Sequence, residues 1–371
     1  MRIALCSDYF YPKIGGITTH IEYLAKFLEK RGHDVIIVTK KASFNDKDLG
    51  LNVVRVSSLF GSANVLDVPY VEELEGVLRR EGVEVVHGHH AFSPISLFSI
   101  SIGKKIGVGT VLTNHSIQFM YDFDLMWRPS SYMLFPVRQM INSADRIIAV
   151  SRAATKFIQH FTNKDIVTIP NGVDVREFEP RSKEFDGKSI LFVGRLVYRK
   201  GILKLLRVMK YIVKENSNAH LTIAGTGYLA PFLRYLINSL NLQKNISVVL
   251  NPSRSEIIKL YQKANVFVMP SIFGESFGIV ILEAMASKTP VVAADQGGIS
   301  EVIKHGETGF LVKNGNEQEM AKYVLELLED REYWRRISDD TFREVKKYDW
   351  EVIGPRIEEL YNRKPRPSGR G

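Results

Sequence analysis

Short β-branched runs alternate with amphipathic stretches along almost the whole chain, and this alternation constrains the fold more than any other feature. The apolar run RIALCS precedes a stretch in which Ile21, Leu24 and Leu28 recur at helical spacing. Further on, Ser253 with Glu256 three residues later predicts a helix that begins with a capping box. Strands that alternate with helices form parallel sheets covered by helices, so the pattern predicts an α/β protein.

The alternation restarts after a polar segment, REFEPRSKEFDGK, near residue 180. Because 371 residues suit two cores better than one, we expect two Rossmann-like doubly wound domains that face each other across a cleft. The expected bounds are 1–180 for the N-terminal, acceptor-side domain and 181–348 for the C-terminal domain. A helix at about 349–361 is expected to cross back to the first domain, and residues 362–371 to form a basic, disordered tail.

Composition limits the compartment and the classes of partner. The single cysteine, Cys6, excludes an intramolecular disulfide and favours a cytoplasmic protein. No apolar run reaches the length of a membrane-spanning helix. The net charge of +9 favours an anionic partner. Charge alone does not distinguish a nucleotide from a nucleic acid or an acidic membrane surface.

The segment 116–140 is rich in aromatic residues and methionine. One interpretation is a loop and helix packed on the first domain. The other is an acceptor or membrane-interface surface, with Trp127, Tyr132 and Arg138 at the level of the headgroups. Peripheral contact with an anionic membrane therefore stays open as a hypothesis.

Glycines and cations follow several predicted strands, at the edge where open parallel sheets bind their ligands. Gly15 and Gly16 either let a phosphate approach the backbone amides or form a turn that needs positive φ. Arg195 and Lys200 flank a strand end and are either a diphosphate site or solvated surface charges. Gly225 marks a further point of close backbone approach.

Two glutamates lie eight residues apart in FGESFGIVILEAMASKTPVVA. Glu275 is expected in a loop that follows a strand. The next helix is expected to begin near Phe277 or Gly278, with free amides as far as Val280. Glu283 then lies more than one turn into that helix, where its carboxylate can accept two hydrogen bonds from a ribose diol. The alternative is a loop glutamate and a surface glutamate without a function.

Histidines cluster in the first half of the chain. We expect no metal site at His87, His89 and His90, because successive residues rarely point the same way and no carboxylate accompanies them. His115 ends a predicted strand. It is interpreted either as a group that binds a hydroxyl or a phosphate, or as a packed, hydrogen-bonded histidine.

Eight motifs, which together extend over nearly the whole chain, resemble those of the retaining glycosyltransferases of family 4, which have the two-domain GT-B fold. The most specific are the two glutamates in their glycine context and the upstream pair of Arg195 and Lys200. The motifs are PKIGGITTHIEYLAKFLEKRGHDV, VVHGHH, VLTNHS, IPNGVD, FVGRLVYRKG, IAGTG, FGESFGIVILEAMASKTPVVA and GGISEVI.

The resemblance implies a role for each matching residue. Arg195 and Lys200 would hold the donor's diphosphate, and Glu283 the ribose hydroxyls. Glu275 would hold the donor sugar, and His115 would lie beside that sugar and the acceptor. The implied catalytic residues are Glu275, His115, Arg195 and Lys200, and the implied donor-binding residues are Gly15, Gly16, Arg195, Lys200, Gly225, Glu275, Ser276, Phe277, Gly278, Ile279, Val280 and Glu283.

The resemblance also implies a mechanism. Family members retain the configuration of the anomeric carbon and need no metal, so we expect neither a metal nor another cofactor. Front-side attack is the favoured route, in which the leaving phosphate accepts the acceptor's proton. Glu275 then positions the sugar and stabilises its cationic transition state without forming a covalent bond.

The wording GRLVYRKGI, TNHS and HHAFSPIS is similar to the branch that contains the phosphatidylinositol N-acetylglucosaminyltransferase catalytic subunits. This likeness implies a UDP-linked donor, with UDP-N-acetylglucosamine favoured, and a lipid-linked, inositol-phosphate or glycan acceptor. The chain ends without the C-terminal membrane span of the eukaryotic subunit, which favours a soluble or peripheral protein. The alternatives are a GDP-mannose-dependent mannosyltransferase, a sugar-nucleotide epimerase of the same architecture and a non-catalytic sugar-nucleotide-binding subunit. No nucleic-acid partner is expected.

Overall fold

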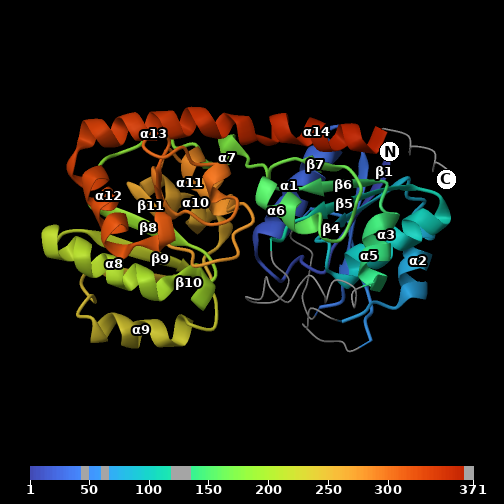
Figure 1. Ribbon diagram of the computed structural model, residues 1–371, viewed down its shortest axis with the longest axis horizontal. Coiled ribbons are helices and arrows are strands. Elements are labelled where there is room, and N and C mark those ends of the chain that lie inside the picture. The colour runs from blue at the N-terminus through green and yellow to red at the C-terminus, as the bar shows by residue number, and fades with distance from the viewer. Residues whose placement is uncertain (43–49, 60–66, 118–134, 363–371) are drawn as a thin grey trace. The chain divides into compact units, whose positions relative to one another are not determined.

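The computed structural model describes residues 1–42, 50–59, 67–117 and 135–362 (Figure 1). Contacts within the chain divide it into two units: unit 1 is Met1–Gly172 together with the segment from Trp350 onward, and unit 2 is Val173–Asp349. Whereas the sequence places the division near residue 180, unit 2 begins at Val173 because Val173 pairs in parallel with Asp349. The amide of Val173 donates to the carbonyl of Tyr348 over 2.9 Å.

Unit 1 is built on a seven-stranded parallel sheet in the order β3-β2-β1-β4-β5-β6-β7. Its strands are β1 (Arg2–Cys6), β2 (Asp34–Lys40), β3 (Val53–Val56), β4 (Val85–His89), β5 (Gly109–Asn114), β6 (Arg146–Ala149) and β7 (Ile166–Thr168). Its helices are α1 (Gly16–Lys30), α2 (Val71–Arg80), α3 (Pro94–Ile106), α5 (Phe135–Ser143), α6 (Arg152–Ile158) and α14 (Trp350–Asn362). Helix α1 packs on α14, and α2 and α5 pack on α3, so helices cover both faces of the sheet (Figure 1).

The core of unit 1 follows from the apolar stripe of α1. Ile21, Leu24 and Leu28 are fully buried, as the helical spacing predicts. Helix α14 packs against the same core, and a Cβ added to Gly354 would lie 2.5 Å from the ring of Phe27. Glycine at 354 therefore allows the close approach of α14 to α1.

Unit 2 has a six-stranded parallel sheet in the order β10-β9-β8-β11-β12-β13. Its strands are β8 (Ser189–Val193), β9 (His220–Gly225), β10 (Ile246–Leu250), β11 (Val266–Met269), β12 (Val291–Ala294) and β13 (Phe310–Val312). Its α-helices are α7 (Val175–Phe178), α8 (Ile202–Glu215), α9 (Ala230–Ser239), α10 (Arg254–Lys263), α11 (Ile279–Ala286), α12 (Glu317–Glu329) and α13 (Arg331–Val345). Short 3₁₀ turns lie at η2 (Tyr198–Lys200), η3 (Ile299–Glu301), η4 (Lys313–Gly315) and η5 (Lys346–Tyr348).

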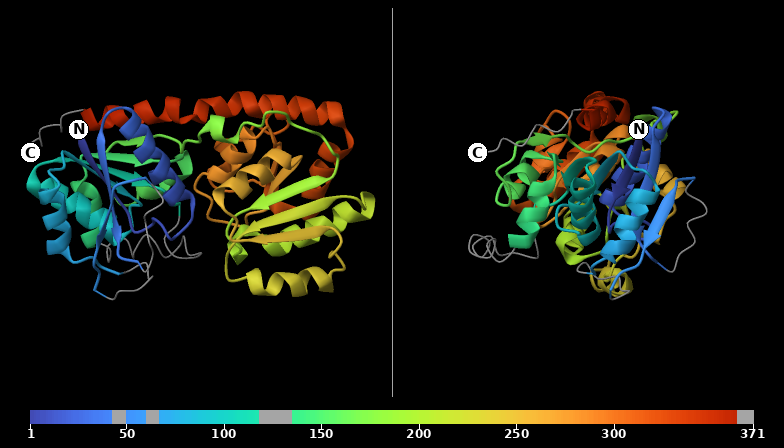
Figure 2. Two further views of the ribbon diagram at one scale, coloured as in Figure 1. Left: turned by 180° about the vertical axis from the view of Figure 1, so that it is seen from behind. Right: turned by 90° about the vertical axis from the view of Figure 1, so that its right-hand side faces the viewer.

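Helices cover both faces of the unit 2 sheet as well (Figure 2). Helix α8 packs on α12, and α11 packs on α13 and α7. The predicted capping box at the start of α10 is confirmed: Ser253 accepts from the amide of Glu256, and the Glu256 side chain accepts from the amide of Ser253. The two parallel-sheet α/β units confirm the predicted pair of Rossmann-like domains.

Each sheet has one point at which the strand order reverses. In unit 1 this switch point lies between β1 and β4, and in unit 2 it lies between β8 and β11. The carboxyl ends of the strands on either side of a switch point are where doubly wound sheets bind ligands. The residues that follow β1, β4, β8 and β11 are therefore the first candidates for a binding site.

Some expectations concern residues outside the described part of the chain. Trp127, Tyr132 and most of the basic tail fall there, whereas Arg138 lies in α5. Within the described residues, no helix is both long and apolar enough to cross a membrane.

Candidate active site

A buried carboxylate marks the switch point of unit 2. Glu275 follows β11 and is only 5% exposed. Its Oε1 accepts from the ammonium of Lys200 and, over 3.2 Å, from the hydroxyl of Ser271. The Arg199 guanidinium lies 3.4 Å from the same oxygen. The chain after β8 and the chain after β11 are thus joined by ion pairs at the place where a ligand is expected.

Backbone geometry brings Lys200 to this position. Gly201 has φ of 75° and ends the turn η2, and a Cβ there would lie 2.0 Å from the carbonyl oxygen of Pro270. Only glycine lets the two segments approach so closely. Burial lowers the pKa of Lys200; the charges of Arg199 and Arg195 lower it further, and Glu275 opposes the shift. The buried ammonium therefore depends on Glu275 to stay charged.

Two further cations, Arg195 and Arg199, lie near Lys200, and Arg199 also contacts Glu275. Arg195 is exposed just after β8, and its charge acts on Lys200. Arg199 is a site residue that is not among those predicted from the sequence, although it stands next to Lys200 in RLVYRKG. The sequence could have predicted Arg199, because several residues of a turn that follows a strand can point toward the switch point.

The N-terminus of α11 lies directly after Glu275. The helix begins at Ile279 with Gly278 as its N-cap in the left-handed region, one residue later than the nearer of the two expected starts. Among the described residues no side chain caps this end. Phe277 is buried against Tyr348, while Ser276 and Val280 are half-buried. The amide of Ile281 donates to the carbonyl of Gly278, so the amides of Ile279 and Val280 are the ones left for an anion or for hydroxyl oxygens.

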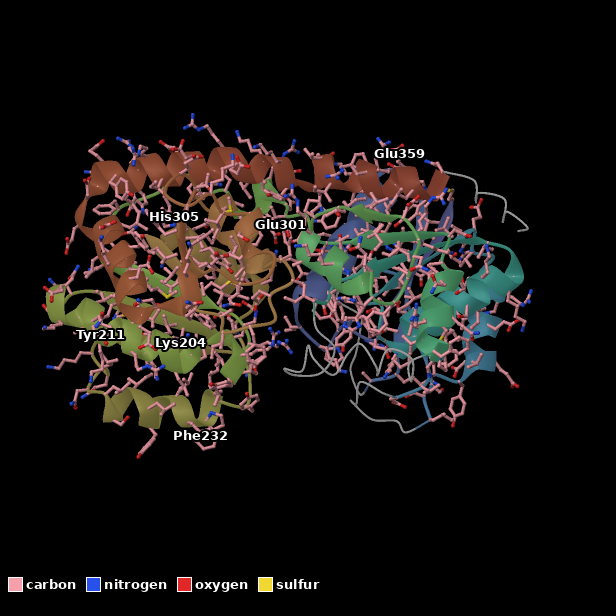
Figure 3. All side chains as sticks on the ribbon, viewed as in Figure 1. Lys204, Tyr211, Phe232, Glu301, His305 and Glu359 are labelled. Atoms are coloured by element: carbon pink, nitrogen blue, oxygen red, sulfur yellow. The ribbon has the colours of Figure 1, made fainter. Side chains whose placement is uncertain are left out.

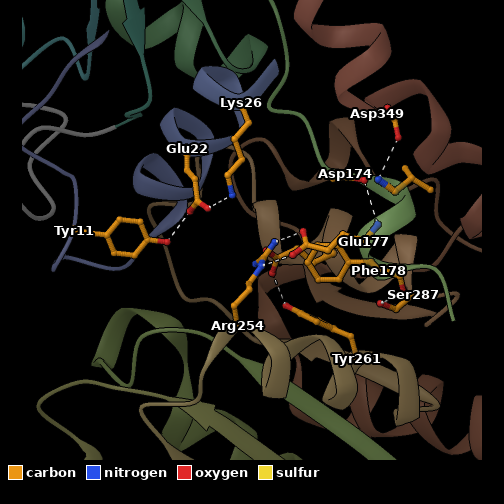
Figure 4. A network of polar contacts seen from close by, with 12 residues as sticks. Tyr11, Glu22, Lys26, Asp174, Glu177, Phe178, Arg254, Tyr261, Ser287 and Asp349 are labelled. Carbon is orange, nitrogen blue, oxygen red and sulfur yellow. Dashed lines mark hydrogen bonds and ion pairs between the residues drawn. The ribbon is translucent and has the colours of Figure 1, made fainter. Parts of the chain in front are cut away.

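Glu283 is a buried residue of α11 with partners that the sequence did not suggest. It is 5% exposed, and Arg254 donates to its Oε1 over 2.8 Å. The hydroxyl of Tyr261 donates to its Oε2 over 3.1 Å. Arg254 also bonds Glu177 over 3.1 Å (Figure 4). Since each carboxylate oxygen has a second acceptor site, Glu283 can still accept bonds from a diol.

Arg254 sits in a setting that fixes its guanidinium. It stacks over the ring of Phe178, 4.6 Å from the ring centroid (Figure 4). Although burial opposes it, the negative charges of Glu283 and Glu177 raise the pKa of Arg254 above its ordinary value. Burial, with Glu283, raises the pKa of Tyr261 well above its ordinary value. The sequence could have drawn attention to Arg254, which is the first residue of α10. A cation at that position is unfavourable to the helix dipole, so its presence suggests another role.

Gly225 has a packing explanation. Its φ is 151°, and a Cβ there would lie 1.9 Å from the carbonyl oxygen of Gly194. Gly227 would meet Leu196 in the same way, at 2.3 Å. These glycines let the chain after β9 pass over the chain after β8. The donor-binding role given to Gly225 stays a prediction.

The glycine pair of unit 1 lies at the start of α1, after β1. Gly15 is the N-cap with φ of 175°, which is extended backbone that any residue adopts. Neither Gly15 nor Gly16 has positive φ, so the alternative of a turn that needs positive φ is wrong. A Cβ on Gly15 would meet nothing within 4 Å. The space beside Gly15 is open.

His115 follows β5 directly and is 7% exposed. Its Nε2 lies 3.4 Å from Nδ1 of His89. Burial, followed by the neighbouring His20, holds the pKa of His115 well below its ordinary value. His115 is therefore a neutral imidazole at neutral pH, which can hydrogen-bond a hydroxyl and carries no charge to hold a phosphate.

The histidines of unit 1 form a different group from the one that the sequence suggested. His87 bonds Tyr361 and Thr113, each over 2.7 Å, and His90 bonds Ser116 over 2.8 Å. Among the described residues, His20, His89 and His115 are the ones whose ring nitrogens lie close enough to share a metal ion. His20 comes from α1, and a histidine at helical spacing within an apolar stripe was the signal that could have found it.

The structure thus gathers Arg195, Lys200, Glu275 and the start of α11 at the switch point of unit 2, with Glu283 on the same helix. Gly15, Gly16 and His115 belong to unit 1. Two family descriptions match this chain, "Glycosyltransferase Family 4" over residues 14–177 and "Glycosyl transferases group 1" over residues 175–343. The chain is a GT-B glycosyltransferase of family 4.

Individual relatives of this glycosyltransferase agree with the assignment. It is 28% identical to an uncharacterized glycosyltransferase of Methanocaldococcus jannaschii, over 97% of this chain and 98% of the relative. It is 26% identical to a phosphatidylinositol N-acetylglucosaminyltransferase subunit of Arabidopsis thaliana, over 100% of this chain and 83% of the relative. The fold is similar to that of Anabaena HepE in complex with UDP, with a TM-score of 0.77, 20% identity and coverage of 97% and 99% of the two chains.

Proposed function

We propose that this glycosyltransferase moves a sugar, N-acetylglucosamine in the first place, from a UDP-linked donor to a lipid-linked, inositol-phosphate or glycan acceptor. The anomeric configuration is retained and no metal is needed. The observation that carries the proposal is the group of Lys200, Arg199 and Glu275 beside the uncapped N-terminus of α11. It places cations and free amides at one switch point, where a sugar diphosphate needs both.

The cations account for the departure of the nucleotide. Breaking the bond between the anomeric carbon and the phosphate oxygen leaves negative charge on the diphosphate. Lys200, Arg195 and the α11 amides stabilise this charge. Fixed hydrogen-bond donors of this kind make the largest single contribution to the rate enhancement of many enzymes. A metal ion is then unnecessary for the leaving group.

Glu275 serves the other half of the reaction. Its carboxylate is bound to Lys200, so it is a poor covalent nucleophile and a good electrostatic partner for the cationic sugar. In the proposed front-side attack, the acceptor oxygen bonds the anomeric carbon on the face that the phosphate leaves. The acceptor's proton passes to the leaving phosphate oxygen, so no protein base is required.

The identity of donor and acceptor rests on the relatives. HepE of similar fold binds UDP, and the Arabidopsis relative is a phosphatidylinositol N-acetylglucosaminyltransferase subunit. Glu283, with both oxygens oriented by Arg254 and Tyr261, suits a ribose diol. We therefore favour UDP-N-acetylglucosamine and an inositol-containing acceptor.

The test is acceptor-dependent release of nucleotide by the chelator-treated protein. UDP-N-acetylglucosamine, UDP-glucose and GDP-mannose are offered in turn with phosphatidylinositol, inositol phosphate and a lipid extract. We expect release of UDP from UDP-N-acetylglucosamine and a product whose anomeric coupling in NMR equals that of the donor.

The test variant is Lys200→Ala, which should lose transfer, and its matched control is Lys204→Ala. Lys204 lies four residues further on and reaches the carbonyls of Asn314 and Gly315, so its removal should leave transfer intact (Figure 3). Inverted product would contradict retention, activity lost to the chelator would contradict metal independence, and faster turnover of GDP-mannose would replace the donor assignment.

A further inference from the structure

Three histidines meet at the switch point of unit 1. His89 is the last residue of β4, His115 follows β5, and His20 lies in the second turn of α1. The ring centroids are 4.9 Å apart for His20 and His115, 5.4 Å for His20 and His89, and 5.6 Å for His89 and His115. One nitrogen from each ring lies within 4.8 Å of the other two.

The three rings are buried and their nitrogens are poorly satisfied. His20 is 2% exposed, and among the described residues neither of its ring nitrogens makes a hydrogen bond of good geometry, although the side chain of Asn171 lies beside it. Nε2 of His89 is buried without a partner as well. Buried polar atoms in native proteins nearly always have a partner, so the unpartnered ring nitrogens of His20 call for a group that binds them.

The neighbouring histidines show how the same fold treats an ordinary buried imidazole. His87 lies two residues before His89 on β4, and both of its nitrogens have partners at 2.7 Å, Tyr361 and Thr113. His90 is bonded to Ser116. Burial alone therefore does not explain why both ring nitrogens of His20 and Nε2 of His89 lack hydrogen-bond partners among the described residues.

One spacing within the cluster, that between His89 and His115, fits two ligands of a tetrahedral metal ion. Zinc binds imidazole nitrogen at about 2.0–2.1 Å, which puts neighbouring ligand nitrogens of a tetrahedron about 3.3–3.4 Å apart. Nδ1 of His89 and Nε2 of His115 are 3.4 Å apart. The same distance is long for a hydrogen bond between two ring nitrogens.

The chemistry of the cluster also fits. Neutral imidazole nitrogens can donate electron pairs to a metal ion, and the buried setting of the three rings favours their neutral form. The side chain of Asn171 lies beside His20, and its Oδ1 has no hydrogen-bond partner among the described residues. An amide oxygen there can accept from the outward N–H of a metal-bound imidazole.

We propose that His20, His89 and His115 bind one divalent transition-metal ion of the zinc class, with water as the fourth ligand. Three neutral nitrogen ligands and an open fourth position are the ligand set of exchangeable zinc sites, and the absence of a carboxylate from the trio disfavours Mg²⁺ and Ca²⁺. The slightly exposed edge of His115 provides the side from which water enters. Because the ion occupies His115, bound zinc lowers the proposed transfer.

The experiment measures metal binding by the full chain after chelator treatment. Zn²⁺ or Co²⁺ is added in amounts up to that of the protein, bound metal is counted by mass spectrometry, and the Co²⁺ absorption spectrum reports its coordination. We expect one ion per chain and the intense visible bands of four-coordinate Co²⁺. In His20→Ala the affinity should fall about 100-fold or more, since even outer partners of a metal ligand cost about 10–100-fold.

Two control variants separate this site from general histidine binding. His90→Ala changes the histidine next to the trio, and His305→Ala removes an exposed histidine of unit 2 (Figure 3). Both should bind the ion as the unaltered chain does. Absence of stoichiometric binding, a six-coordinate Co²⁺ spectrum, or binding that survives in His20→Ala would each overturn the proposal, and the first two need no variant to fold.

Discussion

The two switch points share one topology and differ in how they handle charge. In unit 2, Lys200 and Arg199 are paired with Glu275, and Arg254 with Glu283. In unit 1, the corresponding place holds the imidazoles of His20, His89 and His115, which burial keeps neutral. Unit 1 also holds one buried ion pair, between Asp8 and Lys40. The same strand order thus supports a site of paired cations and carboxylates and a site in which neutral imidazoles predominate.

The difference follows from what each site has to stabilise. A buried ammonium is costly unless a carboxylate offsets its desolvation, and a preformed pair can be rearranged when an anionic ligand arrives. Neutral imidazoles hydrogen-bond hydroxyls or bind a metal ion, and they attract a phosphate only weakly. We therefore expect changes to the charged residues of unit 2 to alter nucleotide binding, and changes to the three histidines of unit 1 to leave it intact.

The largest effect is expected from Lys200→Ala. Loss of one fixed donor to developing charge costs about 10²–10³-fold in kcat, and affinity for UDP should fall as well. Steady-state kinetics and calorimetric titration with UDP measure the two effects. Glu275→Gln should give a comparable loss of kcat while the far-ultraviolet circular dichroism stays unchanged. If both variants kept most of their activity, the charged site would be wrongly assigned.

Glu283→Gln should act on binding. Hydrogen bonds to a charged group contribute about 1.5–3 kcal/mol, so the donor KM should rise about 10–100-fold. The kcat should change little, because the ribose is remote from the reacting carbon. Initial rates over a range of donor concentration separate the two constants. A fall in kcat at constant KM would exclude the ribose role.

His115→Ala tests unit 1. A neutral hydrogen bond contributes about 0.5–1.5 kcal/mol, so loss of one to the sugar or acceptor should lower kcat/KM for transfer by up to about tenfold. The dissociation constant of UDP should not change, since no charge is removed. Kinetics and UDP titration on one preparation give both values. Weaker UDP binding would show that the two switch points do not divide the work in this way.

Arg254→Met should have a smaller effect than Glu283→Gln. In this variant the Glu283 carboxylate keeps its hydrogen bond from the Tyr261 hydroxyl and loses the one from the Arg254 guanidinium. An interaction of ~1 kcal/mol corresponds to a factor of about five, so the donor KM should rise about fivefold. Arg254→Lys should recover part of the loss. The matched control is Arg207→Met, which breaks an exposed pair with Glu317 and should leave KM unchanged. Equal behaviour of the two methionine variants would remove Arg254 from the site.

Stability, as distinct from activity, should depend on one buried lysine. Lys183 donates to the carbonyls of Tyr261 and Gln262 and to Thr289, and burial lowers its pKa to about 7. Above that pH the folded chain loses the proton before the unfolded chain does. Stability should therefore rise with pH between about 7 and 10, by at most about 1.4 kcal/mol per pH unit.

Urea unfolding at two pH values within this window measures the slope for the unaltered chain and for Lys183→Met. The variant should lack this part of the slope. Parallel slopes would mean that Lys183 titrates alike in both states.

Local patterns were sufficient for much of the fold. The stripe of Ile21, Leu24 and Leu28 and the capping box of Ser253 and Glu256 lie within single elements, and both are confirmed. The position of Glu275 after a strand and of Glu283 on the next helix also follows from one continuous stretch. Near neighbours in the sequence share one periodicity, so their relation can be predicted without a tertiary structure.

Partners from distant segments could not be found in this way. Arg254 lies 29 residues from Glu283, and His20 lies on a different element from His89 and His115. Their meeting depends on which strand is placed beside which. Alternation of strands and helices is compatible with many strand orders, and the observed order puts the ends of β8 and β11, and of β1 and β4, side by side.

The sequence by itself determined the two α/β halves, the motif order of family 4 and the local setting of each candidate residue. The tertiary structure alone decided the pairing of Glu275 with Lys200 and Arg199, the orientation of Glu283 by Arg254 and Tyr261, and the meeting of three histidines. The physical reason is that periodicity and capping act over a few residues, whereas desolvation and charge pairing depend on segments that only the strand order brings together.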